Sequence, residues 1–163
     1  MNQPETYLDK ILTPEQAKRK IAGWQHMGQA VVFTNGVFDL LHEGHLHSLA
    51  QAAQEGHHLV VGINSDASVK RLKGPDRPIQ SQTTRAKILA ALLLVDLVIV
   101  FDEDTPAELI ERLQPDVLVK GGDYTAEKIA GADTVLQRGG RVVINPLIEG
   151  FSTTASIRRI KKD

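Results

Sequence analysis

The chain has 163 residues, with 19 basic and 20 acidic side chains, 4% aromatic residues and no cysteine. Its length fits one domain that buries an independent core. The balanced charge and scarce aromatics count against a nucleic-acid or membrane-surface binder, and the absence of cysteine excludes disulfides and thiol chemistry. There is no apolar run of membrane-spanning length and no signal-peptide core, so we expect a cytoplasmic protein.

Residues 1–28 predict a helical extension that packs on the body, which comprises residues 29–163. A helix is predicted at residues 13–27, where Thr13 and Gln16 form the capping box Thr-x-x-Gln. Its apolar stripe consists of Ala17, Ile21 and Trp24. Four apolar residues before this helix leave two alternatives open, packing against the body or against a second subunit in a homodimer. These residues are Tyr7, Leu8, Ile11 and Leu12.

Residues 31–56 have the pattern of a strand, a turn and a helix. The apolar start, VVFT, is typical of a buried strand. The turn NGVFDLLHEGH follows, and we expect Asn35-Gly36 to end the strand because glycine tolerates unusual backbone angles. The helix is predicted to begin near His42 or Gly44, and its first N–H groups would attract an anion.

Two histidines at this predicted helix start indicate a phosphate site. His42 and His45 are three residues apart and share one side of the first turn. Gly44 between them lets a phosphate approach the backbone, and imidazole donates hydrogen bonds to phosphate near neutral pH. Two alternatives stay open: a solvated helix cap, and a zinc site that would need a distant carboxylate as a further ligand.

A second buried strand is predicted at residues 58–63, and Asn64 follows it as the first capping residue of a short helix. His57 and His58 stand at the entry of this strand, away from the histidine turn, and we expect both on the surface. The loop at residues 74–80 follows the short helix, on the side of the sheet where ligands of open α/β sheets bind. The candidate phosphate contacts near this loop are Lys73, Arg77 and Arg85.

A third strand is predicted at residues 97–101, after an apolar helix that starts at Thr83 or Thr84 and runs through residues 85–95. Acidic residues then open another helix. Asp102, Glu103 and Asp104 have two alternative roles. They could form a metal cluster, or they could stabilise the positive end of that helix, which is the favoured alternative.

Residues 116–120 and 141–145 predict the fourth and fifth strands. Lys120 ends the fourth strand and two glycines follow, so the lysine and the Gly122 N–H group suit a phosphate. Three hydroxyl residues after Gly150 exceed what one helix N-cap needs, and Arg158 lies one turn further along. These hydroxyl residues are Ser152, Thr153 and Thr154.

Five strands that alternate with helices predict an α/β fold, a doubly wound five-stranded parallel sheet of Rossmann-like type with strand order 3-2-1-4-5. Each motif follows the carboxyl end of a strand, so we expect one shared site at that edge. The patterns G-x-x-x-x-G-K-[ST] and G-x-G-x-x-G are missing, which counts against a P-loop kinase and a dinucleotide dehydrogenase.

The turn NGVFDLLHEGH resembles the signature of the HxGH nucleotidylyltransferases, cytidylyltransferase-like enzymes that transfer a nucleotidyl group to a phosphate. Four further stretches in order resemble the adenylyltransferases that make ADP-heptose from heptose 1-phosphate and ATP. These stretches are NSDASVKRLKGPDRPI, VDLVIVFDEDTP, PDVLVKGGDY and EGFSTTASIRRI. The resemblance runs over nearly the whole chain, from about Ile11 onward.

The resemblance implies that D-glycero-β-D-manno-heptose 1-phosphate attacks the α-phosphorus of ATP in line and expels pyrophosphate. The catalytic residues would be His42, His45 and Lys120, and the hydroxyls of Ser152, Thr153 and Thr154 would bind the outer phosphates. Further nucleotide or phosphate contacts would be Asn35, Gly36, Phe38, Gly44, Asn64, Lys73, Arg77, Arg85 and Gly122. Asp39 and Asp123 are assigned to the acceptor substrate.

Mg²⁺ is the expected cofactor, held through the ATP phosphates and water with no ligand from protein side chains. The expected partners are ATP and a sugar 1-phosphate supplied by a separate upstream sugar kinase, and neither nucleic acid nor membrane is expected. The product would feed lipopolysaccharide or a related surface glycan. The alternatives are a cytidylyltransferase acting on glycerol 3-phosphate or another alcohol phosphate, a non-catalytic nucleotide-binding module and, with less support, a kinase.

Overall fold

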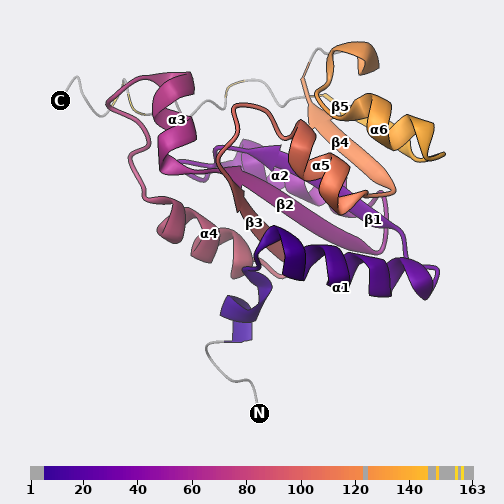
Figure 1. Cartoon of the computed structure of the whole chain (residues 1–163). Coiled ribbons are helices and arrows are strands. Elements are labelled where there is room, and N and C mark those ends of the chain that lie inside the picture. The colour runs from indigo at the N-terminus through magenta and orange to yellow at the C-terminus, as the bar shows by residue number, and fades with distance from the viewer. Residues whose placement is uncertain (1–5, 123–124, 147–149, 151–156, 158, 160–163) are drawn as a thin grey trace.

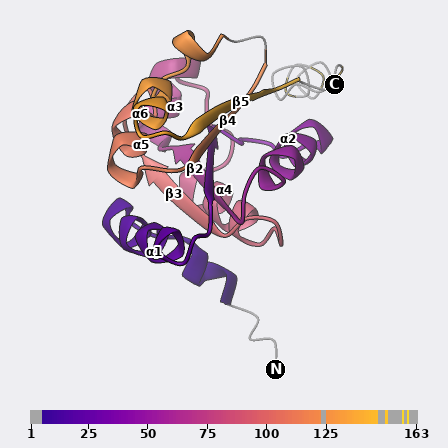
Figure 2. The same cartoon turned by 90° about the vertical axis from the view of Figure 1, so that its right-hand side faces the viewer.

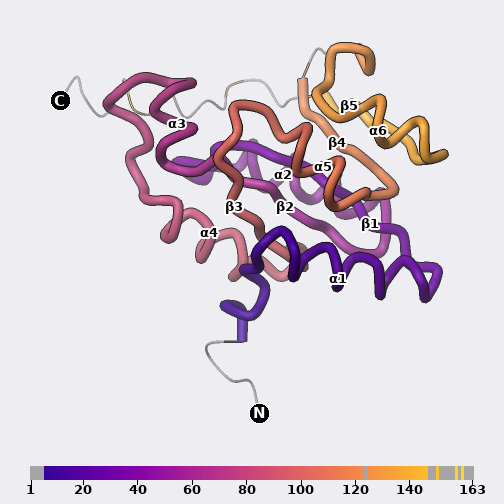
Figure 3. The backbone as a smooth tube through the Cα atoms, viewed as in Figure 1, coloured from indigo at the N-terminus to yellow at the C-terminus, as the bar shows by residue number. Residues whose placement is uncertain are grey.

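The fold is a five-stranded parallel sheet in the order β3-β2-β1-β4-β5, as the sequence predicts. The computed structural model describes residues 6–122, 125–146, 150, 157 and 159 (Figure 1). The strands are β1 (Val31–Gly36), β2 (His58–Asn64), β3 (Leu97–Phe101), β4 (Val117–Gly121) and β5 (Arg141–Asn145). Figure 3 traces the chain from β1 to the β3 edge and back to β4 and β5. The switch point of the sheet therefore lies between β1 and β4.

Helices cover both faces of the sheet (Figure 2). They are η1 (Thr6–Lys10), α1 (Pro14–His26), α2 (Glu43–Ala53), α3 (Asp66–Lys73), α4 (Gln82–Ala90), α5 (Ala107–Leu113), η2 (Ala126–Lys128) and α6 (Ala132–Gln137). One core cluster joins the sheet to α1, α5 and α6, and a second joins it to α2 and α4. Both faces of each central strand are thus buried, which explains why the strands are continuous apolar runs.

The alternation of side chains along a strand divides its residues between the two clusters. In β3, Leu97 and Ile99 belong to the cluster under α1 and α5, whereas Val98 belongs to the cluster under α2 and α4. Successive strand side chains point to opposite faces, so one apolar strand contributes side chains to both core clusters.

The N-terminal segment packs on the body beside β3. The predicted capping box is present, because Gln16 N donates to Thr13 Oγ1 at 3.3 Å and Thr13 N donates to Gln16 Oε1 at 3.0 Å. Before it, Ile11 forms a parallel bridge with Val98. Lys10 Nζ donates to the Leu92 and Val95 carbonyls. The partly buried Tyr7, Ile11 and Leu12 join the two core clusters.

The end of β1 differs from the prediction. Asn35 and Gly36 do not break the strand, because they pair in register with Gly62 and Ile63 of β2. The unusual backbone angle occurs instead at Phe38, where φ is +49°. Gly36 is needed for a close approach, since a Cβ there would lie 2.9 Å from the Phe38 ring.

Two helical predictions need correction. The helix α4 starts at Gln82 with Ser81 as its N-cap and ends at Ala90, so residues 91–95 do not continue it. The helix α5 begins only after Pro106. The short elements η2 and α6 were not predicted, because three and six residues are too few to show a clear apolar period.

His58 is half-buried, contrary to the prediction that it lies on the surface, whereas His57 is exposed. The His58 ring stacks on Trp24 of α1 with ring centroids 3.8 Å apart, and its Nε2 lies 3.0 Å from Gln29 Oε1. The residue therefore joins the start of β2 to the N-terminal helix. None of the helices in the described part of the chain is long and apolar enough to cross a membrane.

Candidate functional site

The candidate site lies where β1 and β4 separate at their carboxyl ends. β1 is in register with β2 over six residue pairs but with β4 over only two, Val32–Val117 and Phe33–Leu118. Beyond these pairs, Lys120 Nζ donates to Asn35 Oδ1 across the gap at 3.4 Å. The switch point of the sheet thus carries a lysine and an amide, the kind of position where open α/β sheets bind ligands.

The two histidines lie together at the start of α2. His42 is the N-cap residue, and its Nδ1 accepts the His45 N–H at 3.4 Å. The two imidazole rings stack with centroids 3.8 Å apart, and the Phe38 ring meets His45 edge-on at 5.2 Å. Because Nδ1 of His42 accepts, a neutral His42 carries its proton on Nε2 and is a donor there.

Burial favours the neutral form of both imidazoles. It lowers the pKa of His42 below the ordinary 6.5. The pKa of His45 falls to about 4 through burial and the neighbouring His42, against a smaller opposing hydrogen bond with the Leu40 backbone. A bound anion would offset this burial, since a nearby opposite charge favours the protonated form.

Lys120 is a half-buried cation with a polar but uncharged neighbour. Burial lowers the pKa of Lys120 below its ordinary 10.5. Among the described residues its hydrogen bond goes to the Asn35 side chain, and no ion pair with a carboxylate is formed. Removing a charge from water without an opposite charge is unfavourable, so an anionic ligand would stabilise this lysine.

Two pockets open on either side of this lysine and share Asn35, Gly36, Val37 and Lys120. The histidine pocket, with a volume of about 200 Å³, is bounded by His45 and Ser48 of α2. The lysine pocket, with a volume of about 340 Å³, is bounded by residues of α3, η2 and the segment before α5. Two groups bound in these pockets would meet at Lys120.

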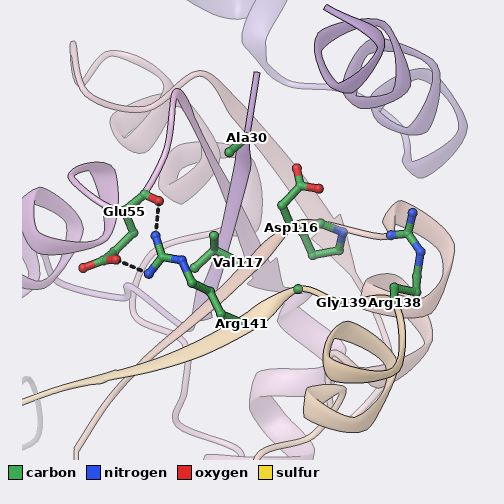
Figure 4. A pocket seen from close by; sticks show the side chains of 9 residues that line it. Ala30, Glu55, Asp116, Val117, Arg138, Gly139 and Arg141 are labelled. Atoms are coloured by element: carbon green, nitrogen blue, oxygen red, sulfur yellow. Dashed lines mark hydrogen bonds and ion pairs between the residues drawn. The ribbon is translucent and has the colours of Figure 1, made fainter. Parts of the chain in front are cut away.

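A third hollow lies at the opposite, amino ends of β1, β4 and β5 (Figure 4). Its charged side chains bind one another or the backbone. Arg141 donates to the Glu55 carboxylate and carbonyl, and Asp116 accepts from Val31 N at 2.8 Å. These bonds hold strand ends together, which leaves the carboxyl edge as the better candidate for chemistry.

Asp39, assigned from the sequence to the acceptor substrate, is turned to the protein. Its carboxylate is only 1% exposed. It accepts hydrogen bonds from the Ile79 and Gln80 N–H groups at 2.9 Å and from Arg77 Nε at 2.7 Å. Burial alone would raise the pKa of Asp39, but these backbone donors and Arg77 hold it below 3.8. Asp39 therefore fixes the 74–80 loop to the turn after β1.

Arg85 is likewise not placed to contact a phosphate. Its side chain is fully buried, and its three nitrogens donate to Gln80 O at 3.0 Å, Val37 O at 2.8 Å and Asp66 Oδ1 at 2.8 Å. The guanidinium thus joins the loop, the turn after β1 and the start of α3. Arg77 is partly available, since among the described residues its side-chain hydrogen bond is the one from Nε to Asp39.

The other predicted residues lie at varying distances from the crevice. Asn64 and Lys73 bound the lysine pocket, Phe38 bounds the histidine pocket, and Gly44 lies in the first turn of α2. The Gly122 N–H, predicted to hold a ligand, donates instead to Asn145 O at 3.0 Å and extends the sheet. Asp123, Ser152, Thr153, Thr154 and Arg158 lie outside the described residues.

The acidic segment before α5 is bound to α3. Arg71 Nε donates to Asp104 Oδ1 at 2.9 Å and also approaches Asp102, which accepts from the Ser65 hydroxyl. Within the described ranges, no three His, Cys, Asp or Glu side chains are grouped as a metal site. The segment thus positions α3 beside the lysine pocket.

Two residues that line the lysine pocket were not predicted as site residues from the sequence. Lys128 belongs to η2, which is too short to show a periodic pattern, and Thr105 stands in the acidic segment among residues already explained as helix-start groups. The sequence signal that could have indicated Lys128 is its position within ten residues of the Lys-Gly-Gly motif.

The family model described as cytidylyltransferase-like matches residues 33–159. The chain belongs to this cytidylyltransferase-like family. The matched range begins inside β1 and includes the histidine turn, the 74–80 loop and Lys120, so the family's shared region coincides with the crevice described above.

Relatives and solved structures agree with this membership. The chain is 53% identical to the bifunctional protein HldE of Gluconobacter oxydans, over 95% of this chain and 32% of that protein. It is 55% identical to that of Caulobacter vibrioides, over 93% and 31%. The chain therefore spans about a third of the length of these relatives.

A solved structure, the lipopolysaccharide core biosynthesis protein from Thermoplasma volcanium, has 30% identity and a TM-score of 0.59, covering 74% of this chain and 98% of that one. Family and relatives together identify a nucleotidyltransferase.

The buried Asp39 carboxylate generates a prediction of stability against pH. Asp39→Asn should lower the free energy of unfolding near neutral pH by about 1–3 kcal/mol, the usual cost of impairing buried hydrogen bonds. Because the folded-state pKa of Asp39 lies below 3.8, its contribution is present above that value and is lost as the pH falls through the folded pKa. Urea unfolding at several pH values measures the difference.

Asp76→Asn in the same loop is the matched control, because Asp76 is exposed. It should unfold like the wild type at every pH. A difference between wild type and Asp39→Asn that does not shrink on acidification would show that the Asp39 charge is not what binds the loop.

The histidine turn generates a second prediction. In the free protein the His45 ring should titrate with a pKa of about 4, and pyrophosphate should raise this pKa because an anion offsets the effect of burial. Histidine-ring NMR spectra recorded during a pH titration, with and without pyrophosphate, measure both effects. The signals of the exposed His26 ring should not respond to pyrophosphate. A His45 that titrates near 6.5 with no anion would contradict the buried geometry.

Proposed function

We propose that this cytidylyltransferase-like chain transfers the AMP group of ATP to D-glycero-β-D-manno-heptose 1-phosphate, forming ADP-heptose and pyrophosphate. The observation that carries the proposal is that His45, in the first turn of α2, and Lys120 line one pocket at the gap between β1 and β4, with the His42 ring stacked on His45. A helix N-terminus, two imidazoles and a lysine with no carboxylate partner among the described residues suit the joining of two phosphates.

The acceptor is supported by resemblance and by the names of similar proteins. The stretches that contain Lys73, Lys120 and Thr153 resemble the adenylyltransferases that make ADP-heptose. The similar structure from Thermoplasma volcanium is named a lipopolysaccharide core biosynthesis protein, which suits a product used in surface glycans. ATP as the donor rests on the same resemblance.

The reaction we propose needs positioning and charge stabilisation rather than a protein nucleophile. An oxygen of the sugar phosphate forms a bond to the α-phosphorus, and the bond from that phosphorus to the bridging oxygen breaks, releasing pyrophosphate. His42 and His45 would donate to the α-phosphate and the bridging oxygen, and Lys120 would reduce the repulsion between the two anions. The side chains predicted for the outer phosphates, from Ser152 to Thr154, complete the donor site.

We propose that Mg²⁺ binds here through the phosphates of the nucleotide. Within the described part of the chain, no cluster of three or more His, Cys, Asp or Glu residues is present to hold it, so its ligands would be phosphate oxygens and water. When bound, it would neutralise charge on the triphosphate.

We also propose that a sugar kinase supplies the acceptor. The curated relatives are named bifunctional, and the present chain matches about a third of their length. The rest of such proteins therefore has room for a second activity, and a kinase that makes the sugar 1-phosphate would fit that role. A homodimer stays a prediction.

A second candidate is cytidylyl transfer to glycerol 3-phosphate or another alcohol phosphate, which the cytidylyltransferase-like description of the matching family favours. A non-catalytic nucleotide-binding module is a third. Both use the same fold and the same crevice, so only product analysis separates them from the adenylyltransferase.

The first functional prediction concerns the substrates. Purified protein with Mg²⁺ should release pyrophosphate from ATP and heptose 1-phosphate, with ADP-heptose as the main product and no activity in excess chelator. The same assay offers CTP in place of ATP and glycerol 3-phosphate in place of the sugar. A larger kcat/KM for CTP with glycerol 3-phosphate would replace the named reaction, and ligand binding without pyrophosphate release would favour the non-catalytic module.

The second functional prediction concerns the histidine turn. His45→Ala should lower kcat about 10²–10³-fold, the usual effect of removing one transition-state charge contact, with a much smaller change in ATP affinity. His47→Ala is the control, because His47 is exposed on the same helix and does not line either pocket. Near-normal turnover by His45→Ala in steady-state kinetics would remove this residue from the chemistry.

A further inference from the structure

The lysine pocket has a charged rim and a cationic floor. Lys73 and Lys128 are exposed at its edge, and the half-buried Lys120 lies deeper, beside Asn35. The acidic residue among its described lining is Asp104, whose carboxylate is already bound by Arg71 at 2.9 Å. The pocket therefore has a net positive charge, which suits a phosphorylated ligand.

The same pocket offers hydrogen-bonding groups around an apolar surface. Thr105 and Asp104 supply a hydroxyl and a carboxylate, and Lys128 supplies an ammonium. Leu72, 46% exposed, contributes aliphatic surface next to them. Donors and acceptors spaced around aliphatic groups fit a polyol, whose hydroxyls alternate with C–H groups.

Each of the two pockets suits one of the two ligands. The histidine pocket contains the α2 side of the crevice, where we place the nucleotide's α-phosphate, and it is the smaller of the two, at about 200 Å³ against about 340 Å³. A sugar phosphate in the lysine pocket would put its phosphate at the shared Lys120 and its ring carbons toward Leu72. A short alcohol phosphate bound at Lys120 has fewer hydroxyl groups and would fill less of this pocket.

We propose that the lysine pocket holds the sugar of the acceptor, and that Thr105 and Lys128 are specificity-determining residues that select a polyhydroxylated sugar phosphate over a short alcohol phosphate. This assignment rests on the proposed adenylyl transfer for the acceptor's identity. Its physical basis is that a rim hydrogen bond is made only by ligands long enough to reach it, so its loss weakens long acceptors selectively.

The test compares acceptors across variants of the full chain. Lys128→Ala should raise KM for heptose 1-phosphate about tenfold and Thr105→Val about three- to tenfold, the range expected for losing one hydrogen bond. For both, kcat and the KM for ATP should stay within about twofold, and the KM for glycerol 3-phosphate should not rise. Lys70→Ala is the matched control, since Lys70 is exposed on α3 and does not line the pocket.

Calorimetry separates failure of this assignment from failure of the reaction. Heptose 1-phosphate is titrated into wild type and Lys128→Ala in the presence of α,β-methylene ATP, which cannot release pyrophosphate. Weaker binding by Lys128→Ala supports the pocket even if no ADP-heptose is formed. Formation of ADP-heptose with an unchanged KM in both variants and unchanged binding by Lys128→Ala would overturn the assignment and leave the reaction intact. Wild type that neither binds nor converts the sugar would overturn both.

Discussion

The separation of β1 from β4 beyond Phe33 and Leu118 is the constraint on which the site depends. Strands are added in opposite directions from this pair, so α2 after β1 packs on one face and α6 after β4 packs on the other. The backbone therefore leaves a gap at the carboxyl edge, with α2 starting beside it. Lys120 crosses that gap to Asn35, so a cation stands where two pockets join.

The charges near this gap fall into two groups with different physical roles. Asp39 and Arg85 are buried and bonded to several backbone groups each, so they hold the turn after β1, the 74–80 loop and the start of α3 together. Asp39 forms an ion pair with Arg77, and Arg85 forms one with Asp66. Removing one member of either pair would leave a buried charge uncompensated, so each pair holds its segments in place. The pocket lysines Lys73, Lys120 and Lys128 have no carboxylate partner among the described residues, so their charges are available to a ligand.

The sequence predicts the parts of this protein that depend on local pattern. Strand order follows from buried apolar runs separated by helices, and the capping box at Thr13 and the His42 helix start follow from residue types at fixed spacing. It does not predict the destinations of Arg85 and Asp39, because a guanidinium near a ligand edge looks the same whether it meets a phosphate or a carbonyl. The sequence also predicts the turn at Gly36, whereas the left-handed backbone angle occurs at Phe38. Packing rather than residue type imposes that angle.

Burial acts on the ligand-facing groups in one direction. It lowers the pKa of His42, His45 and Lys120 alike, and so makes the uncharged form of each more favourable than it would be in water. An anion in the crevice reverses this effect for all three, because opposite charge restores the protonated form. Binding of phosphate and uptake of protons are therefore linked at this site. In the reaction that we propose, the first phosphate to bind would therefore strengthen the positive charge that meets the second.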